Sequence, residues 1–225
     1  MAKILSYVLC LWCVVAMTPL MAADIVKSTF DNNLPNADWD GWTETPTTNQ
    51  VTWANPGGNP DGYLRFADSV AGATWLSAPS KFLGSWQSYS TFSWDQKSEG
   101  SGSFQNQVLI YGIYNGSQAF AAWWPDSQNG PINWTNYGVS ITAPDWGHMA
   151  VSVSGPPPED VWASIISNVT AVEILIDATP NMSDDIEGVD NPTLTPVPEP
   201  STLILLGIGA IGLLGNAWRR RKRTA

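Results

Sequence analysis

Apolar residues between positions 24 and 194 occur in short segments, and stretches of turn formers such as 55–62, 99–102 and 129–131 separate them. Short strands that alternate with turns are typical of antiparallel sheets packed face to face. The pattern therefore predicts an all-β fold, an antiparallel β-sandwich, over residues 24–194. We expect its strands near residues 25–30, 50–54, 63–67, 73–77, 88–96, 106–114, 118–124, 134–142, 148–154, 170–177 and 188–194.

One segment of this region has helical instead of alternating spacing. Its apolar residues recur at intervals of one, three and four, namely at Val161, Trp162, Ile165, Ile166 and Val169. Prolines at 156–158 and two acidic residues precede them, and both features favour the start of a helix. We expect one short helix here, covering part of the sandwich.

The amino-terminal segment has the layout of a secretory signal peptide. Lys3 precedes an apolar run over residues 4–17, which is followed by Pro19 and the small residues Ala22 and Ala23. The run is too short for a membrane span, and small residues before a cleavage site are typical of exported chains. We expect residues 1–23 to be removed and the domain that starts at Asp24 to be exported.

The carboxy terminus combines a proline-rich stalk over 195–202, an apolar run over 203–218 and a basic tail over 219–225. Sixteen helical residues span about 24 Å, somewhat less than a hydrocarbon core of about 30 Å. Tilt, and the interfacial residues Trp218, Arg219, Arg220 and Arg221, would allow a single transmembrane helix over 203–218. The basic tail would then be cytoplasmic and the sandwich would lie outside.

Pro198, Glu199 and Pro200, the apolar run and the arginine-rich end, in this order, closely resemble the PEP-CTERM sorting signal of bacterial surface proteins. The resemblance implies that an exosortase, a membrane transpeptidase-like protease, recognises Pro198, Glu199 and Pro200 and removes the helix. The anchor would then be transient, whereas a plain one-helix anchor would be permanent.

Five stretches in the middle of the chain, taken in order, resemble the laminin IV type A (laminin B) domain. They are residues 57–64, 77–84, 134–137, 166–172 and 188–191. The resemblance covers roughly residues 28–194. It implies a jelly-roll-like β-sandwich, similar in architecture to carbohydrate-binding modules, with no known catalytic residues. Pro192 departs from the family pattern, and because proline has no N–H we expect it on an edge strand or at a strand's first position.

Charge and residue usage narrow the chemistry of the exported region. Residues 24–194 carry 4 basic and 19 acidic residues, a formal charge of −15, and such a surface repels nucleic acid and anionic lipid. Both cysteines, Cys10 and Cys13, lie in the signal peptide, and His148 is the only histidine of the chain. We therefore expect no thiol, zinc or Ser-His chemistry, and no enzymatic activity.

Carboxylates leave one metal hypothesis open, a structural Ca²⁺ site, because Ca²⁺ binds six to eight oxygen ligands. Asp31 follows the first expected strand and Asp190 lies in the last one, and these strands are neighbours in a jelly roll. Asp31, Asp190 and, third, Asp61 are the candidate ligands. The alternative is that these side chains bind backbone groups in turns.

Trp123 and Trp124 are adjacent in an expected strand, so their rings point to opposite faces and cannot both fill one core. An exposed ring can stack on a sugar, although a loop can also cover it.

The sequence therefore predicts an exported bacterial surface or exopolysaccharide-associated protein that is non-enzymatic and acts in adhesion or matrix interaction. A carbohydrate-binding module is the first alternative, and a glycoside-active enzyme is the second.

Overall fold

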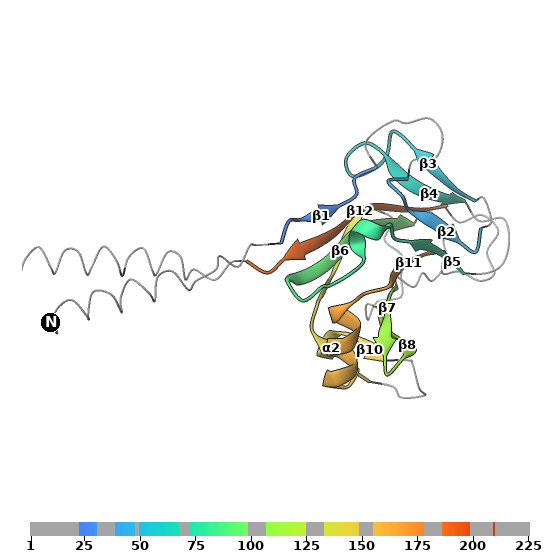
Figure 1. Ribbon diagram of the computed structural model, residues 1–225. Helices are drawn as coiled ribbons and strands as arrows, with labels where there is room; N and C mark the ends of the chain where they lie inside the picture. Colours follow the sequence, from blue (N-terminus) through green and yellow to red (C-terminus); the bar gives the residue numbers. More distant parts are fainter. Residues whose placement is uncertain are drawn as a thin grey trace, which may run out of the picture. The chain divides into compact units, whose positions relative to one another are not determined.

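The computed structural model describes residues 23–30, 39–47, 50–67, 73–98, 107–124, 133–148, 155–177, 186–198 and 209. Residues 24–197 form one compact unit, made of two antiparallel six-stranded sheets and one α-helix (Figure 1). The predicted all-β sandwich with one short helix is confirmed.

The first sheet, sheet A, contains the last strand of the domain at its centre. Its strand order is β3-β4-β12-β6-β9, and β1 also pairs with β12. The bounds are β1 Val26–Lys27, β3 Val51–Ala54, β4 Tyr63–Ala67, β6 Tyr89–Ser98, β9 Thr135–Ser140 and β12 Ile186–Pro196. The first and last strands are therefore neighbours, as predicted.

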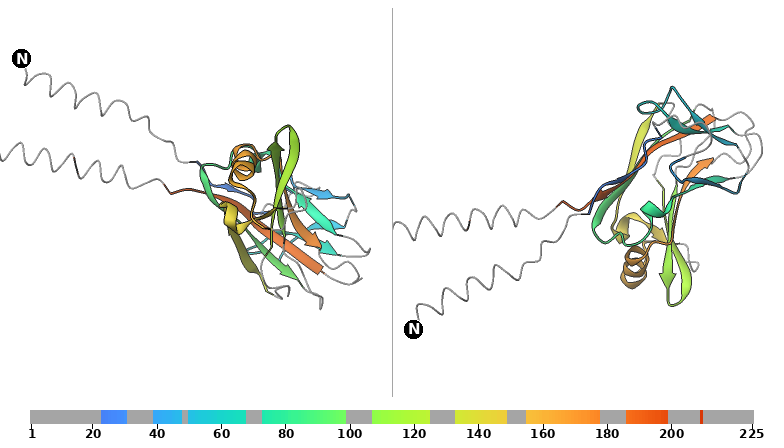
Figure 2. Two further views of the ribbon diagram at one scale, coloured as in Figure 1. Left: turned by 90° about the horizontal axis from the view of Figure 1, so that it is seen from below. Right: turned by 45° about the horizontal axis from the view of Figure 1, so that its top comes forward.

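The second sheet, sheet B, has the order β10-β8-β7-β11-β5-β2. Its strands are β2 Thr43–Thr45, β5 Thr74–Ser77, β7 Val108–Tyr114, β8 Ser117–Trp123, β10 Gly147–His148 and β11 Ala171–Asp177. Two 3-10 helices, Ser80–Phe82 and Ala143–Asp145, lie in the connections. Figure 2 shows the two sheets from two further directions.

Trp94 on β6 lies at the centre of the core between the sheets. It is fully buried, and its ring contacts those of Phe92, Trp123 and Tyr137 at centroid distances of 5.7, 5.6 and 5.8 Å. Its indole N–H donates to Gln96 Oε1 at 2.8 Å, and Gln96 Nε2 donates to the Leu175 carbonyl of β11 at 3.0 Å. Aromatic packing and one buried polar chain thus connect sheet A to sheet B.

The helix α2, Glu159–Ser167, begins directly after the prolines, where the sequence predicts it. It packs beside β7 and β8, at the bottom of the domain in Figure 1. Gly112 of β7 permits this close approach, because a Cβ there would lie 2.7 Å from Ile165 Cα. The helix buries Val161, Trp162 and Ile165 in the common core.

Two expectations about strands are wrong. No strand was expected at Thr43–Thr45, yet β2 forms there at the edge of sheet B. Pro192 was expected on an edge or at a strand start, but it lies inside β12, which pairs on both sides. The register with β6 shifts between Asp190 and Thr193, so Pro192 lies in a β-bulge. At this bulge no hydrogen bond to β6 requires the N–H group that proline lacks.

The structure contains no helix long and apolar enough to cross a membrane in the part of the chain that it describes. Apart from Gly209, the predicted helix over 203–218 lies outside the described residues and stays a prediction.

Candidate functional site

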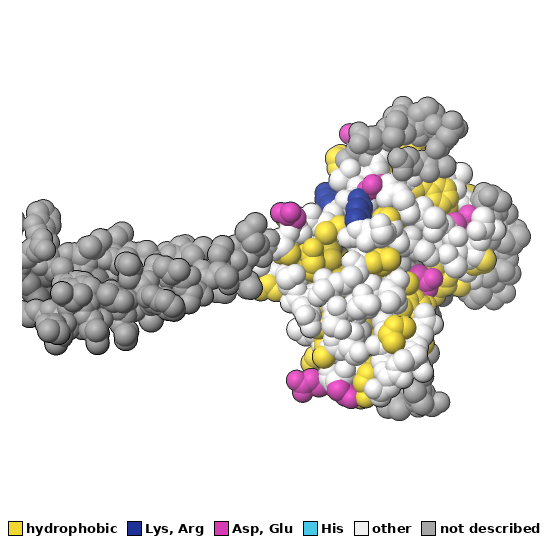
Figure 3. Space-filling view, in the orientation of Figure 1, with side chains coloured by type: hydrophobic (Ala, Val, Ile, Leu, Met, Phe, Trp, Pro, Cys, Tyr) yellow, Lys and Arg dark blue, Asp and Glu magenta, His cyan; other side chains and the backbone are white. Residues whose placement is uncertain are grey.

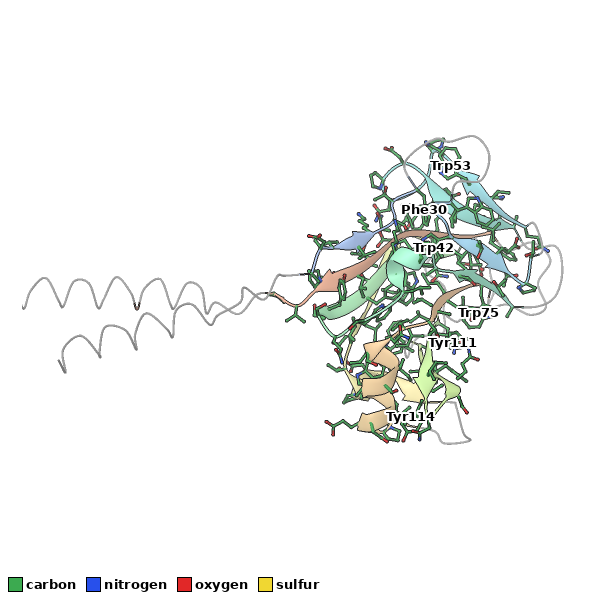
Figure 4. The ribbon with its side chains drawn as sticks, in the orientation of Figure 1. Phe30, Trp42, Trp53, Trp75, Tyr111 and Tyr114 are labelled. Carbon is green, nitrogen blue, oxygen red and sulfur yellow. The ribbon has the colours of Figure 1, made fainter. Side chains whose placement is uncertain are left out.

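The outer face of sheet B carries a set of aromatic side chains. Val108 and Ile110 of β7 are buried in the core, so strand alternation places Leu109, Tyr111 and Ile113 on the outer face. Paired residues of antiparallel strands share a face, and Phe120 of β8 is the partner of Tyr111. Their rings lie 5.7 Å apart, and Figure 4 labels Tyr111 on this sheet.

Trp75 and Trp124 belong to one row that crosses the strands of this face. Trp75 on β5 pairs with Leu175 on β11, and the Leu175 N–H donates to the Gln107 carbonyl just before β7 at 2.9 Å. Val108 pairs with Trp123 at the end of β8, so Trp124, the next residue, lies opposite Gln107. Three strand spacings separate Trp75 from Trp124, which corresponds to about 14 Å.

Trp124 is the most exposed tryptophan of this row. Its side chain is 48% exposed, and its ring lies against Gly147, where a Cβ would come within 2.9 Å of Trp124 Cη2. Trp123 instead points inward and packs edge-on against Trp94. Of the two predicted stacking residues, Trp123 is half-buried and Trp124, just beyond the end of β8, is exposed. Sugar stacking stays a prediction.

Tyr111 links the aromatic face to a carboxylate. Its hydroxyl donates to Glu173 Oε2 of the neighbouring strand β11 at 2.7 Å. Burial raises the pKa of Tyr111, and the hydrogen bond to Glu173 raises it further. The face therefore presents a carboxylate whose orientation is fixed by a neutral phenol.

This raised pKa predicts that the fold loses stability at alkaline pH. Above the ordinary tyrosine value of about 10, the unfolded chain loses the proton that folded Tyr111 keeps, so stability falls as pH rises. Between pH 8 and about pH 11, we expect the melting temperature of the Tyr111→Phe protein to fall less than that of the wild type. Parallel thermal melts check this, and equal slopes for both proteins would contradict it.

A second cluster ties the 55–62 loop to the outer face of sheet A. Asp190 is fully buried, and its two carboxylate oxygens accept the backbone N–H groups of Asn59 and Asn191, each at 2.7 Å. Asp95, its cross-strand partner on β6, accepts from Asn136 Nδ2 and Asn191 Nδ2 at 2.8 Å each. The carboxylates thus hold backbone and amide groups of the loop and the neighbouring strands.

An aromatic pair next to this cluster encloses a lysine. Lys97 Nζ lies 4.5 Å from the ring centroid of Tyr63 and 5.1 Å from that of Trp134. Trp134 Nε1 donates to the Gly57 carbonyl at 2.7 Å, and Gly188 leaves room for both rings. These contacts fix the 55–62 loop, so the two rings on the outer face of sheet A already contact a lysine and a loop of the same domain.

The structure does not test the three predicted calcium ligands as a set, because it describes only two of them. Asp190 is buried and engaged with backbone N–H groups, Asp61 is exposed in the loop, and Asp31 lies outside the described residues. The structure holds no group of three His, Cys, Asp or Glu suited to a metal within its described ranges. The calcium hypothesis stays a prediction.

The remaining predicted positions concern sorting. β12 ends at Pro196, the Val197 N–H donates to the Ser88 carbonyl at 2.9 Å, and Pro198 is exposed. Glu199, Pro200, Trp218 and Arg219–Arg221 lie outside the described residues. The ordered fold therefore reaches to the residue before the Pro-Glu-Pro stretch.

Residues 196–222 match the PEP-CTERM protein-sorting motif. This confirms the predicted sorting segment, and the motif implies an exported surface protein. No curated protein matches the chain.

Solved structures with similar folds include a human laminin domain. The L4b domain of human laminin alpha-2 has a TM-score of 0.50 and 10% identity, and the alignment covers 70% of this chain and 97% of that one. At this identity, the likeness shows the fold alone, and the fold is the one that the laminin resemblance implies.

Two bacterial modules match at lower TM-scores. The family 11 carbohydrate-binding module of a Clostridium thermocellum cellulase has a TM-score of 0.48 and 15% identity, covering 79% of this chain and 99% of that one. The K1 cleaved adhesin domain of Lys-gingipain from Porphyromonas gingivalis has 0.44 and 10%, covering 78% and 100%.

Proposed function

We propose that this protein is an exosortase-processed surface protein whose β-sandwich adheres to extracellular polysaccharide without transforming it. The sorting motif at 196–222 supports export and display. The outer face of sheet B supports recognition, and the observation that carries the proposal is the exposed ring of Trp124 held against Gly147.

The chemistry of this face fits a neutral sugar chain. An aromatic ring stacks on the apolar C–H face of a sugar, and a few oriented polar groups then bind its hydroxyls. Trp124 and Trp75 provide two rings in one row. Glu173 provides a hydrogen-bond acceptor on β11, which lies between the strands of the two tryptophans, and the hydroxyl of Tyr111 orients its carboxylate. Because about 14 Å separates the two positions, a chain of several sugar rings is needed to reach both.

Charge supports the same choice of ligand. Acidic side chains are scattered over the visible face of the domain, whereas the few Lys and Arg side chains gather in one small area (Figure 3). Residues 24–194 have a formal charge of −15, so a neutral polysaccharide meets no long-range repulsion, whereas a polyanion does.

Affinity electrophoresis in gels that contain the extracted exopolysaccharide tests this function. We expect Trp124→Ala to weaken retardation by about tenfold, and Trp75→Ala to weaken it less, because Trp124 is exposed whereas Trp75 is half-buried. Ile113→Ala is the matched control, because Ile113 is 45% exposed on the same face.

Retardation that is unchanged in a folded protein lacking both tryptophans would overturn the binding proposal. Release of soluble products from the polysaccharide, abolished by a single Asp or Glu substitution, would instead favour the glycoside-active alternative.

A further inference from the structure

The end of the sandwich that precedes the sorting segment exposes two large aliphatic side chains. Ile25 is 64% exposed and Val197 is 47% exposed, and these are two of the four exposed large apolar side chains among the described residues. The other two, Ile113 and Trp124, belong to the outer face of sheet B.

The strand register places Ile25 and Val197 close together on one face. Val26 pairs with Leu194, and Lys27 pairs with Thr193. Leu194 is buried in the core, so alternation turns Lys27 of β1, and Ile25 just before β1, to the outer face of sheet A. Beyond a register shift after Thr195, Pro196 pairs with Tyr89, which packs against the core, so Val197 also faces outward. We call Ile25, Lys27 and Val197 the terminal patch.

The terminal patch has the composition of a membrane-contacting surface. Lys27 is exposed and is one of only four basic residues in the range 24–194, yet it lies on the same strand face as Ile25. Removal of residues 1–23 would add the amino group of Asp24, which offsets the carboxylate of that residue. An ammonium group beside exposed aliphatic side chains fits lipid phosphate groups and the adjoining acyl boundary. Because residues 24–194 carry a formal charge of −15, the covalent tether and not long-range attraction brings the patch to the bilayer.

The covalent chain limits how far this patch can move from the membrane. Five residues, 198–202, separate Val197 from the apolar run that starts at Leu203. Fully extended, the six steps from Val197 to Leu203 span at most about 21 Å, and the interfacial layer of one leaflet already takes about 5–8 Å of this. The Val197 N–H is still bonded to Ser88, so the fold adds no slack.

We infer that the terminal patch rests on the lipid surface while the C-terminal helix is in the membrane, and that processing releases it. This inference rests on the proposed anchor at 203–218. In this state the sandwich sits directly on the bilayer, and the Pro-Glu-Pro stretch is held within the interfacial layer where a membrane protease can bind it.

A single-cysteine label tests this contact, because the chain from residue 24 onward contains no cysteine. Val197→Cys and the control Ile113→Cys, made in the chain 24–225, carry an environment-sensitive fluorophore in vesicles of phosphatidylcholine and phosphatidylglycerol at a ratio of three to one. Positions 197 and 113 are both exposed aliphatic sites, so they differ in location and not in kind.

We expect quenching by headgroup-region spin-labelled lipids to be about twofold or more stronger at position 197 than at 113, because only the former lies in the interfacial layer. Equal quenching at both positions, in chains that float with the vesicles, would overturn the inference alone. Chains that fail to float would overturn the anchor, and the inference with it. Circular dichroism verifies that each labelled chain remains folded.

Discussion

Replacing Trp94 with alanine is expected to lower the free energy of unfolding of residues 24–197 by about 3–5 kcal/mol, the usual cost of truncating a large buried ring. Trp94 is fully buried and contacts three aromatic rings across both sheets. Its loss also leaves the buried Gln96 Oε1 without its indole donor, and Gln96 is the group that bonds β11.

Trp124→Ala is the matched control for this prediction, because it removes the same ring from an exposed position. We expect it to cost less than about 1 kcal/mol, in the range of ordinary surface substitutions. Urea denaturation followed by far-UV circular dichroism measures both changes through the transition midpoint. Similar midpoints for the two variants would show that Trp94 is not the centre of the core.

Replacing Asp190 with alanine is expected to destabilise the domain by about 2–4 kcal/mol. Two partly buried backbone N–H groups lose their carboxylate acceptor, and a buried donor left without its partner costs about 1–3 kcal/mol. The neighbouring loop can relax around the truncated side chain, so the cost stays below the sum of two fully unsatisfied donors.

Asp61→Ala, which truncates an exposed carboxylate in the same loop, is expected to leave the denaturation midpoint almost unchanged. The same proteins test the calcium hypothesis. If Asp190 and Asp61 bind Ca²⁺, a chelator lowers the midpoint of the wild type and has no effect on either variant. An unchanged wild-type midpoint, together with a calorimetric titration without heat, would reject calcium.

Local patterns in the sequence predict most of the fold. Alternation identifies β11, where Val172, Ile174 and Ile176 share the core face, and helical spacing after the prolines identifies α2. β2 escapes prediction because it consists of Thr43, Glu44 and Thr45, three polar residues with no apolar alternation. Its pairing with β5, not its own residues, makes it a strand.

The candidate site is only partly predictable for the same reason. Two consecutive tryptophans at a strand end indicate that one ring faces outward, and Trp124 does. Trp75 lies 49 residues away in sequence and joins the same row only through the order β8-β7-β11-β5. Likewise, the bond between Asn59 and Asp190 joins residues 131 positions apart. Long-range strand order sets both juxtapositions, and no local pattern contains it.

The C-terminus of the extracellular protein, determined by mass spectrometry in strains with and without the exosortase, tests the central claim most directly. That claim is that the fold ends at Val197 and everything after it serves sorting. We predict that the extracellular form ends between Pro198 and the start of the apolar run, that it keeps the melting temperature of residues 24–197, and that the strain lacking the exosortase retains the full chain in its membranes. An uncut C-terminal tail in both strains would contradict this account.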